Sequence, residues 1–210
     1  MNGNPSVVKA TQCQVGQWTR NRETFTSLAS RRMMVSMKVV NRDTWLRQDD
    51  EILLRDCDED HFRASGPGGQ HRNKVETAVR LHHRPSGVLA QAVESRHREE
   101  NRLKALRRLR DALAMQLRLP FDLGSPELPA EFVARRTADG KLSVSQKNPG
   151  YPLIVATALD ALDAAQGSYA AAGKALGLTT SQFIRFLQAD PQVWRTVKER
   201  GGHDTPSPLV

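Results

Sequence analysis

The most constraining feature of the sequence is the run Gly-Pro-Gly-Gly at residues 66–69. Glycine adopts backbone angles that are closed to other residues, and proline fixes its own φ and lacks an N–H, so this run cannot lie inside a helix or a strand. A neutral amide, Gln70, follows directly, and a basic, polar segment comes next. The pattern predicts an exposed loop whose backbone closely approaches an anionic partner.

Regular elements are expected on both sides of this loop. The acidic start of residues 49–57 predicts a short helix, because acidic side chains complement the positive end of the helix dipole. Residues 62–65 are expected to form a strand that leads into the loop. After the loop, Asn73 and Glu76 have the spacing of a helix cap with a reciprocal acid, which predicts a helical turn over residues 74–78.

A β-hairpin and a long helix are predicted next. Side chains alternate in character over residues 79–83, residues 84–87 match a type I turn, and residues 88–93 form the returning strand. Ser95 is the expected cap of a helix whose leucines recur every three or four residues. These leucines are Leu103, Leu106, Leu109, Leu113 and Leu117. Packed on the hairpin, the helix completes a small α+β domain over residues 41–118.

The second half of the chain is expected to be helical. Prolines and glycines predict a linker over residues 119–151, with a short strand at 141–145. Helices are expected at 153–165, 169–176, 181–188 and 191–199. They would form a small all-α domain over residues 152–200, followed by a flexible tail at 201–210. The alanines and glycines of residues 170–187 are similar to a helix-turn-helix of nucleoid-associated regulators, because small residues let two helices cross closely.

The charge distribution indicates a nucleic-acid partner. The net charge is +8, and residues 61–120 hold thirteen Lys or Arg against five acids, whereas residues 121–210 hold nine of each. A basic segment of this kind is expected of a surface that meets nucleic acid. The alternative is a solvated arginine-rich helix, which explains Arg107, Arg108 and Arg110 equally well.

Residues 1–40 are basic and polar without a sustained period, which predicts disorder. Two interpretations stay open, a transit segment or a translation start at Met33, Met34 or Met37. The two cysteines are too few for a disulfide framework, no apolar run approaches about 20 residues, and no secretory signal is visible. A cytoplasmic protein that crosses no membrane is therefore expected.

No conventional catalytic or metal constellation stands out. His82 and His83 are adjacent on a predicted strand and so point to opposite faces, and no histidine pair has metal-ligand spacing. No serine lies in a nucleophile elbow, and neither cysteine lies in a setting that favours a thiolate. The sequence therefore predicts no metal and no cofactor.

Gly68-Gly69-Gln70 resembles the GGQ signature of bacterial-type class I peptide chain release factors and their ribosome-rescue relatives. The resemblance covers roughly residues 49–117. It continues through Asn73-Lys74, Thr77-Ala78-Val79-Arg80-Leu81, His83-Arg84-Pro85-Ser86-Gly87 and Asn101-Arg102. A lone GGQ tripeptide recurs by chance, but the extended pattern in a fixed order is specific.

The resemblance implies hydrolysis of the ester that joins a nascent peptide to tRNA in the large ribosomal subunit. The backbone N–H of Gln70 would stabilise developing oxygen charge, its side chain would position water, and Gly68 and Gly69 would allow the close approach. Basic residues around the loop would contact ribosomal RNA phosphates. These are Arg63, His71, Arg72, Lys74, Arg80, Arg96, Arg98 and Arg102. The protein would act as a monomer on the ribosome and peptidyl-tRNA.

Departures from the family pattern refine this expectation. Arg72 stands where most relatives have a small apolar residue, and His97-Arg98 stands where they have a Ser-Gln pair. Neither the Pro-x-Thr nor the Ser-Pro-Phe tripeptide of codon-reading factors occurs, and 210 residues leave no room for their separate domain. The expected activity is therefore codon-independent, although the tail at 201–210 lacks the strong basic charge of known rescue hydrolases.

Two other functions remain open from the sequence. One is a non-catalytic RNA- or DNA-binding protein that uses the basic domain and the helix-turn-helix. The other is a factor that needs a partner to read its signal. The trigger for recruitment and the methylation state of Gln70 are not determined by the sequence.

Overall fold

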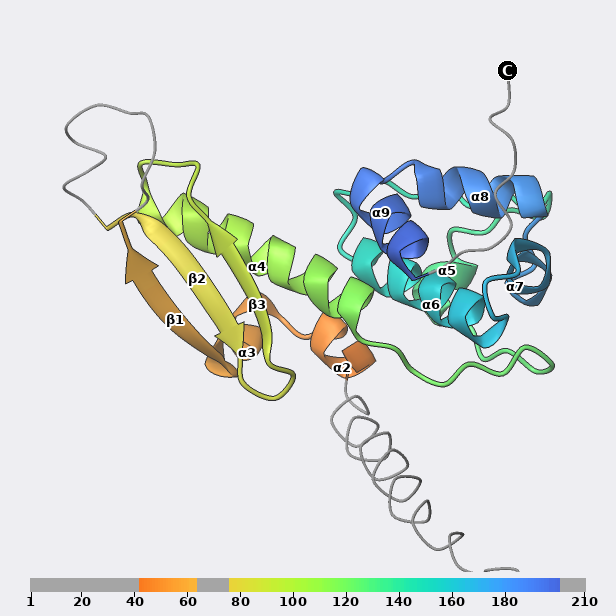
Figure 1. The fold of residues 1–210 in the computed structure, drawn as a ribbon, viewed down its shortest axis with the longest axis horizontal. Coiled ribbons are helices and arrows are strands. Elements are labelled where there is room, and N and C mark those ends of the chain that lie inside the picture. Colours follow the sequence, from red (N-terminus) through yellow and green to blue (C-terminus); the bar gives the residue numbers. More distant parts are fainter. Residues whose placement is uncertain (1–41, 64–75, 201–210) are drawn as a thin grey trace, which may run out of the picture. The chain divides into compact units, whose positions relative to one another are not determined.

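The computed structural model describes residues 42–63 and 76–200 (Figure 1). The predictions for residues 1–40, for the Gly-Pro-Gly-Gly loop and for the tail at 201–210 lie outside the described residues.

A three-stranded antiparallel sheet forms the first half of the described chain. Its strands are β1 (Cys57–Phe62), β2 (Ala78–His83) and β3 (Val88–Ala92), in the order β1-β2-β3. The hairpin between β2 and β3 is confirmed, with His83 paired with Val88 across a four-residue connection. Gly87 closes this connection at φ 74°, a left-handed conformation that favours glycine.

The first strand starts earlier than the sequence predicts. The helix before it, α3, covers only Asp50–Arg55, and β1 already begins at Cys57, so the prediction of a strand at 62–65 was wrong in its boundaries. The acidic run in β1 is compatible with a strand because β1 is an edge strand. Asp58 and Asp60 are exposed while their backbone pairs with β2. Pairing with β2 therefore outweighed the low strand propensity of the acids.

The helical turn predicted over residues 74–78 is wrong at its described end. Ala78 is the first residue of β2 and pairs with Phe62. Residues 76 and 77 have no regular structure. The backbone groups of Ala78 are satisfied by the sheet instead of a helix, which is why the capping spacing did not decide the local structure.

The long helix α4 (Arg98–Gln116) packs on β2 and β3 (Figure 1). Leu106, Leu109 and Leu113 are fully buried, as the leucine spacing predicts. Leu103 is the exception, because its side chain is 54% exposed. Ala105 is buried instead.

A short helix that the sequence does not reveal completes this core. Helix α2 (Arg42–Arg47) buries Trp45 and Leu46. The Trp45 indole meets the edge of the His83 imidazole, with ring centroids 4.7 Å apart. Burial lowers the pKa of His83, whose Nδ1 lies 2.7 Å from the Ser86 hydroxyl. His83 is thus a neutral core residue.

The helices of the second half form their own core. They are α5 (Ala130–Val133), α6 (Tyr151–Ala164), α7 (Tyr169–Ala175), α8 (Thr180–Gln188) and α9 (Pro191–Glu199). The last four agree with the predicted helices within two residues. The predicted linker is more ordered than expected, because it contains α5 and buries Phe132 completely. The predicted strand at 141–145 is reduced to one bridge between Arg136 and Leu142.

Helix α6 joins the two cores. Leu153 and Ala156 of α6 pack into the core beneath the sheet, although most of α6 belongs to the helical core. Arg42 of α2 and Asp160 of α6 form a buried bidentate ion pair, with N–O distances of 2.8 and 2.6 Å. The two halves are therefore connected by both apolar and ionic contacts.

A partly buried carboxyl on α4, that of Asp111, is expected to make stability depend on pH. Burial and the nearby Asp190 raise the pKa of Asp111 to about 6. Ionising Asp111 therefore lowers the free energy of unfolding. The loss is complete above about pH 6 and becomes progressively smaller toward pH 4. We expect Asp111→Asn to raise the free energy of unfolding by about 2 to 3 kcal/mol at pH 7.5, and by much less at pH 4.5.

Urea unfolding of both proteins at the two pH values measures this difference. The matched control is Asp139→Asn, since Asp139 is exposed. Equal effects of the two substitutions at pH 7.5 would show that burial of Asp111 does not penalise its charge.

No helix of the described ranges 42–63 and 76–200 is long and apolar enough to span a bilayer.

Candidate functional site

The predicted catalytic loop connects two paired strands. The end of β1 and the start of β2 are neighbours, because Phe62 pairs with Ala78. Next to this pair, Arg63 Nε lies 3.4 Å from Glu76 Oε1. The segment that holds Gly68, Gly69 and Gln70 therefore leaves and rejoins the sheet at one place. Gly68, Gly69, Gln70, His71, Arg72 and Lys74 themselves lie outside the described residues.

Asn101 anchors two backbone segments close to this place, one before β2 and one after β3. Its amide Nδ2 donates to the Thr77 carbonyl at 2.7 Å and to the Ser95 carbonyl at 2.9 Å, and its Oδ1 accepts from the Ser95 N–H at 2.9 Å. The side chain is fully buried. Asn101 thus ties the first turn of α4 to the residue before β2 and to the connection after β3.

We expect Asn101→Asp to destabilise the protein by about 2 to 4 kcal/mol. Aspartate keeps the acceptor but cannot donate, so the Thr77 and Ser95 carbonyls lose their partner, and an ionised carboxylate in this place adds a desolvation cost. Urea unfolding measures the loss. The control is Gln116→Glu on the same helix, where the side chain is exposed. A loss no larger than that of the control would mean that water replaces the Asn101 donor.

Asn101, rather than Ser95, therefore organises the start of α4. The prediction that Ser95 caps this helix was wrong in detail, because the helix begins at Arg98 and His97 occupies the cap position without a side-chain bond. The Ser95 hydroxyl instead accepts from the His97 N–H at 3.0 Å and donates to Glu100 at 2.5 Å. Asn101 was noticed only as part of the family pattern, since an asparagine inside a helix gives no local signal of burial.

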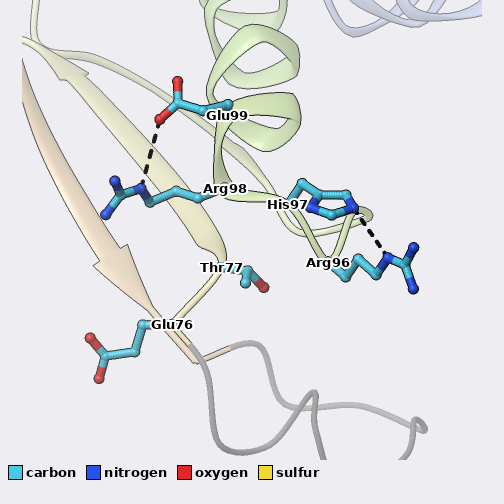
Figure 2. Close-up of a pocket in the computed structure, with 6 residues that line it drawn as sticks. All are labelled: Glu76, Thr77, Arg96, His97, Arg98 and Glu99. Atoms are coloured by element: carbon cyan, nitrogen blue, oxygen red, sulfur yellow. Dashed lines mark hydrogen bonds and ion pairs between the residues drawn. The ribbon is translucent and has the colours of Figure 1, made fainter.

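An open pocket of about 480 Å³ lies beside this anchor (Figure 2). Its walls come from the residues before β2 and from the start of α4. They are Glu76, Thr77, Arg96, His97, Arg98 and Glu99. Figure 2 shows the Arg96 and Arg98 side chains extending to opposite sides of Thr77. Arg96 Nε donates to His97 Nε2 at 3.1 Å, and Arg98 Nε lies 3.9 Å from Glu99.

The structure places four of the described RNA-binding candidates at two positions. Arg63, Arg96 and Arg98 lie around the base of the loop, together with the pocket. Arg80 lies on the opposite side of the sheet from α4, since it alternates with the buried Val79 and Leu81. Its guanidinium stacks over the Phe62 ring at 5.0 Å.

Most of these arginines already have an acidic partner. Arg102 Nε donates to Glu59 of β1 at 3.0 Å, and the pairs of Arg63 with Glu76 and of Arg98 with Glu99 are described above. The sequence suggested Glu76 only as a helix-capping acid and did not indicate that Glu59 or Glu76 pairs with an arginine. Exposed pairs of this kind are worth only about 0 to 1 kcal/mol. A phosphate can therefore compete for these guanidinium groups at a small cost.

Comparison with known proteins relates this part of the chain to a family. The model of the RF-1 domain matches residues 47–121, which include α3, the sheet, the loop and α4. This segment is a class I release factor domain. Residues 122–200, with α5 to α9, lie outside the match.

Individual release factors are also similar to part of this chain. The chain is 42% identical to peptide chain release factor 1 of Acidiphilium cryptum (strain JF-5) over 96 residues, which cover 46% of this chain and 24% of that protein. It is 43% identical to peptide chain release factor 2 of Buchnera aphidicola subsp. Baizongia pistaciae over 67 residues, and 45% identical to that of Helicobacter pylori (strain Shi470) over 65. The last two matches cover 32% and 31% of this chain, and 18% of each release factor. The chain thus spans a quarter or less of these relatives.

Proposed function

We propose that this protein hydrolyses the ester of peptidyl-tRNA on the ribosome without reading a stop codon. The observation that carries the proposal is the position of Gly68-Gly69-Gln70 inside the release factor domain, on the segment between the paired ends of β1 and β2. The relatives that share this domain are named peptide chain release factors.

The proposed reaction needs little from the protein beyond this loop. The oxygen of a water molecule attacks the ester carbonyl carbon, the bond to the tRNA ribose oxygen breaks, and that oxygen leaves with a proton as a hydroxyl. The Gln70 N–H donates to the carbonyl oxygen as it becomes negative, and the Gln70 side chain positions the water. One such donor is worth about 3 kcal/mol of transition-state stabilisation. The reaction requires no general base from this chain, which agrees with the finding that no conventional catalytic constellation stands out in the sequence.

The base of the loop is suited to ribosomal RNA. Arg63, Arg96 and Arg98 lie around it. The acidic partners of Arg63 and Arg98 are exposed, so these two pairs are readily exchanged for phosphates. Asn101 holds the backbone at Thr77 and Ser95 in place. The free energy gained from contacts with RNA can therefore be used to position the loop.

The segment that follows the domain supports codon independence, because it forms α5 to α9, a helical core that lies outside the family match.

Release of labelled peptide from ribosomes stalled on a message without a stop codon tests this proposal. We expect the purified protein to release peptide there, and at the same rate when a stop codon occupies the decoding site. Release that requires the stop codon would replace the proposal with codon-dependent termination. Binding to ribosomes without any release would indicate a non-catalytic protein or a missing partner.

A further inference from the structure

Helices α7 and α8 cross closely because of one glycine. A Cβ placed on Gly173 of α7 would lie 3.3 Å from the Leu178 carbonyl oxygen and 3.6 Å from the Phe183 Cβ of α8. Gly173 and Ala172 are both buried there. The small residues therefore let the two helix backbones approach, as the alanine and glycine pattern predicts.

The turn between these helices is tightly defined. Gly177 has φ 66°, and a Cβ on it would collide with the Arg136 guanidinium, whose NH1 donates to the Leu176 carbonyl at 3.0 Å. Leu178 is buried in the helical core. Thr179 then caps α8, since its hydroxyl accepts from the Gln182 N–H at 3.3 Å. Two short helices joined by a short turn that contains glycine are the elements from which a helix-turn-helix is built.

The outer face of α8 carries groups that suit base edges and phosphates. Ser181, Arg185 and Gln188 are exposed and recur at intervals of four and three residues, so they share one face of the helix. Arg185 makes no ion pair with the residues in 42–63 and 76–200. It is thus available to a ligand, unlike the paired arginines of the release factor domain.

The surrounding charge is positive. Neither α7 nor α8 contains an acidic residue, and Lys174 of α7 is exposed. Residues 168–200 hold five Lys or Arg against two acids, a net charge of +3. One of these acids, Asp190, is occupied within the fold by the Tyr151 hydroxyl and by the first turn of α9. The face therefore complements a polyanion.

We propose that the α7–α8 unit binds duplex DNA, with the outer face of α8 in the major groove and Lys174 at the phosphate backbone. DNA is favoured over duplex RNA on geometric grounds. The major groove of B-form DNA admits an α-helix, whereas that of A-form RNA is too deep and narrow. Ser181, Arg185 and Gln188 would contact base edges, and this site lies outside the release factor domain. The activity is additional to peptide release.

A binding selection with the full chain tests this site. Wild type and Arg185→Glu are used to select from a 20-base-pair duplex library with a randomised centre, and the bound duplexes are sequenced. Affinity for the selected duplex, and for an RNA duplex of the same sequence, is then measured by fluorescence anisotropy. Arg107→Glu on α4 is the control, since Arg107 is exposed and the charge change is identical.

We expect wild type to enrich one sequence motif and Arg185→Glu to enrich none. The affinity of Arg185→Glu for the selected duplex is expected to fall at least tenfold, with a shallower salt dependence, while Arg107→Glu changes it less than threefold. Equal losses in both variants would show that only net charge matters, and equal or tighter binding of the RNA duplex would place the partner among RNAs. Either result overturns the proposal, as does the absence of binding.

Peptide release separates this proposal from the one above. Arg185→Glu is expected to keep the wild-type release rate on stalled ribosomes. A variant that folds normally by circular dichroism but loses release would mean that α8 contacts the ribosome, and the DNA proposal would fall while the hydrolase proposal stands.

Discussion

Replacing Gly69 by alanine is expected to slow peptide release about 10²- to 10³-fold. Gly69 precedes Gln70, and a Cβ at this position restricts the backbone angles available to aim the Gln70 N–H. Losing one donor to a developing oxyanion costs about 2.7 to 4 kcal/mol, which corresponds to this range. Single-turnover release of labelled peptide from saturated ribosome complexes measures the chemical step directly.

Two controls locate the effect. Gly124→Ala changes a glycine outside the loop, where the new Cβ would meet only the Asp122 side chain at 3.4 Å, so release is expected to stay at the wild-type rate. Ribosome binding by Gly69→Ala should also remain within threefold of wild type, because the basic residues at the base of the loop are intact. Wild-type release by Gly69→Ala would refute the assignment of the chemistry to Gly68-Gly69-Gln70.

Replacing Arg42 by alanine is expected to give a large loss of stability, about 3 to 5 kcal/mol. The side chains of Arg42 and Asp160 are 1% and 4% exposed, and removing one partner leaves the other charge buried without compensation. The same guanidinium also donates to the Leu117 carbonyl at 3.1 Å, and Asp160 accepts from the Leu119 N–H at 3.1 Å. The pair therefore fixes α2, the end of α4 and α6 together.

Urea unfolding of Arg42→Ala against Arg47→Ala measures this contribution. Arg47 is on the same helix and makes a similar bidentate pair with Glu131, but those side chains are 46% and 34% exposed, so its loss should cost at most about 1 kcal/mol. The double variant Arg42→Met/Asp160→Leu should recover most of the stability, since apolar residues of similar volume can replace a buried pair. A cost of Arg42→Ala no greater than that of Arg47→Ala would contradict the buried pair.

Local patterns predicted the elements that are determined by neighbouring residues. The alternation at 79–83, the turn ending at Gly87 and the leucine spacing of α4 each depend on a few adjacent positions, and all three are present. The four helices from α6 to α9 were predicted for the same reason. The family resemblance, carried by an ordered set of motifs, was confirmed over residues 47–121.

The sequence failed where long-range contacts override local preference. The acidic residues of β1 favour solvent or a helix start, and only pairing with β2 makes them a strand. Leu103 fits the leucine spacing of α4, but its side chain is exposed, because the side of the helix that packs on the sheet does not include it. Phe132 lies in a segment rich in proline and glycine, and nothing nearby shows that it fills the helical core. Each outcome depends on a partner distant in sequence.

The resemblance to release factors, the hairpin of β2 and β3 and the run of C-terminal helices could be predicted from the sequence alone. The reason is that short motifs and periodic side chains act within a few residues. Two contacts could be found only in the three-dimensional structure. Asn101 bonds the Thr77 and Ser95 carbonyls, and Arg42 meets Asp160, which is 118 positions away in the sequence. A polar residue reveals no partner in its own sequence context, and burial makes that partner energetically necessary.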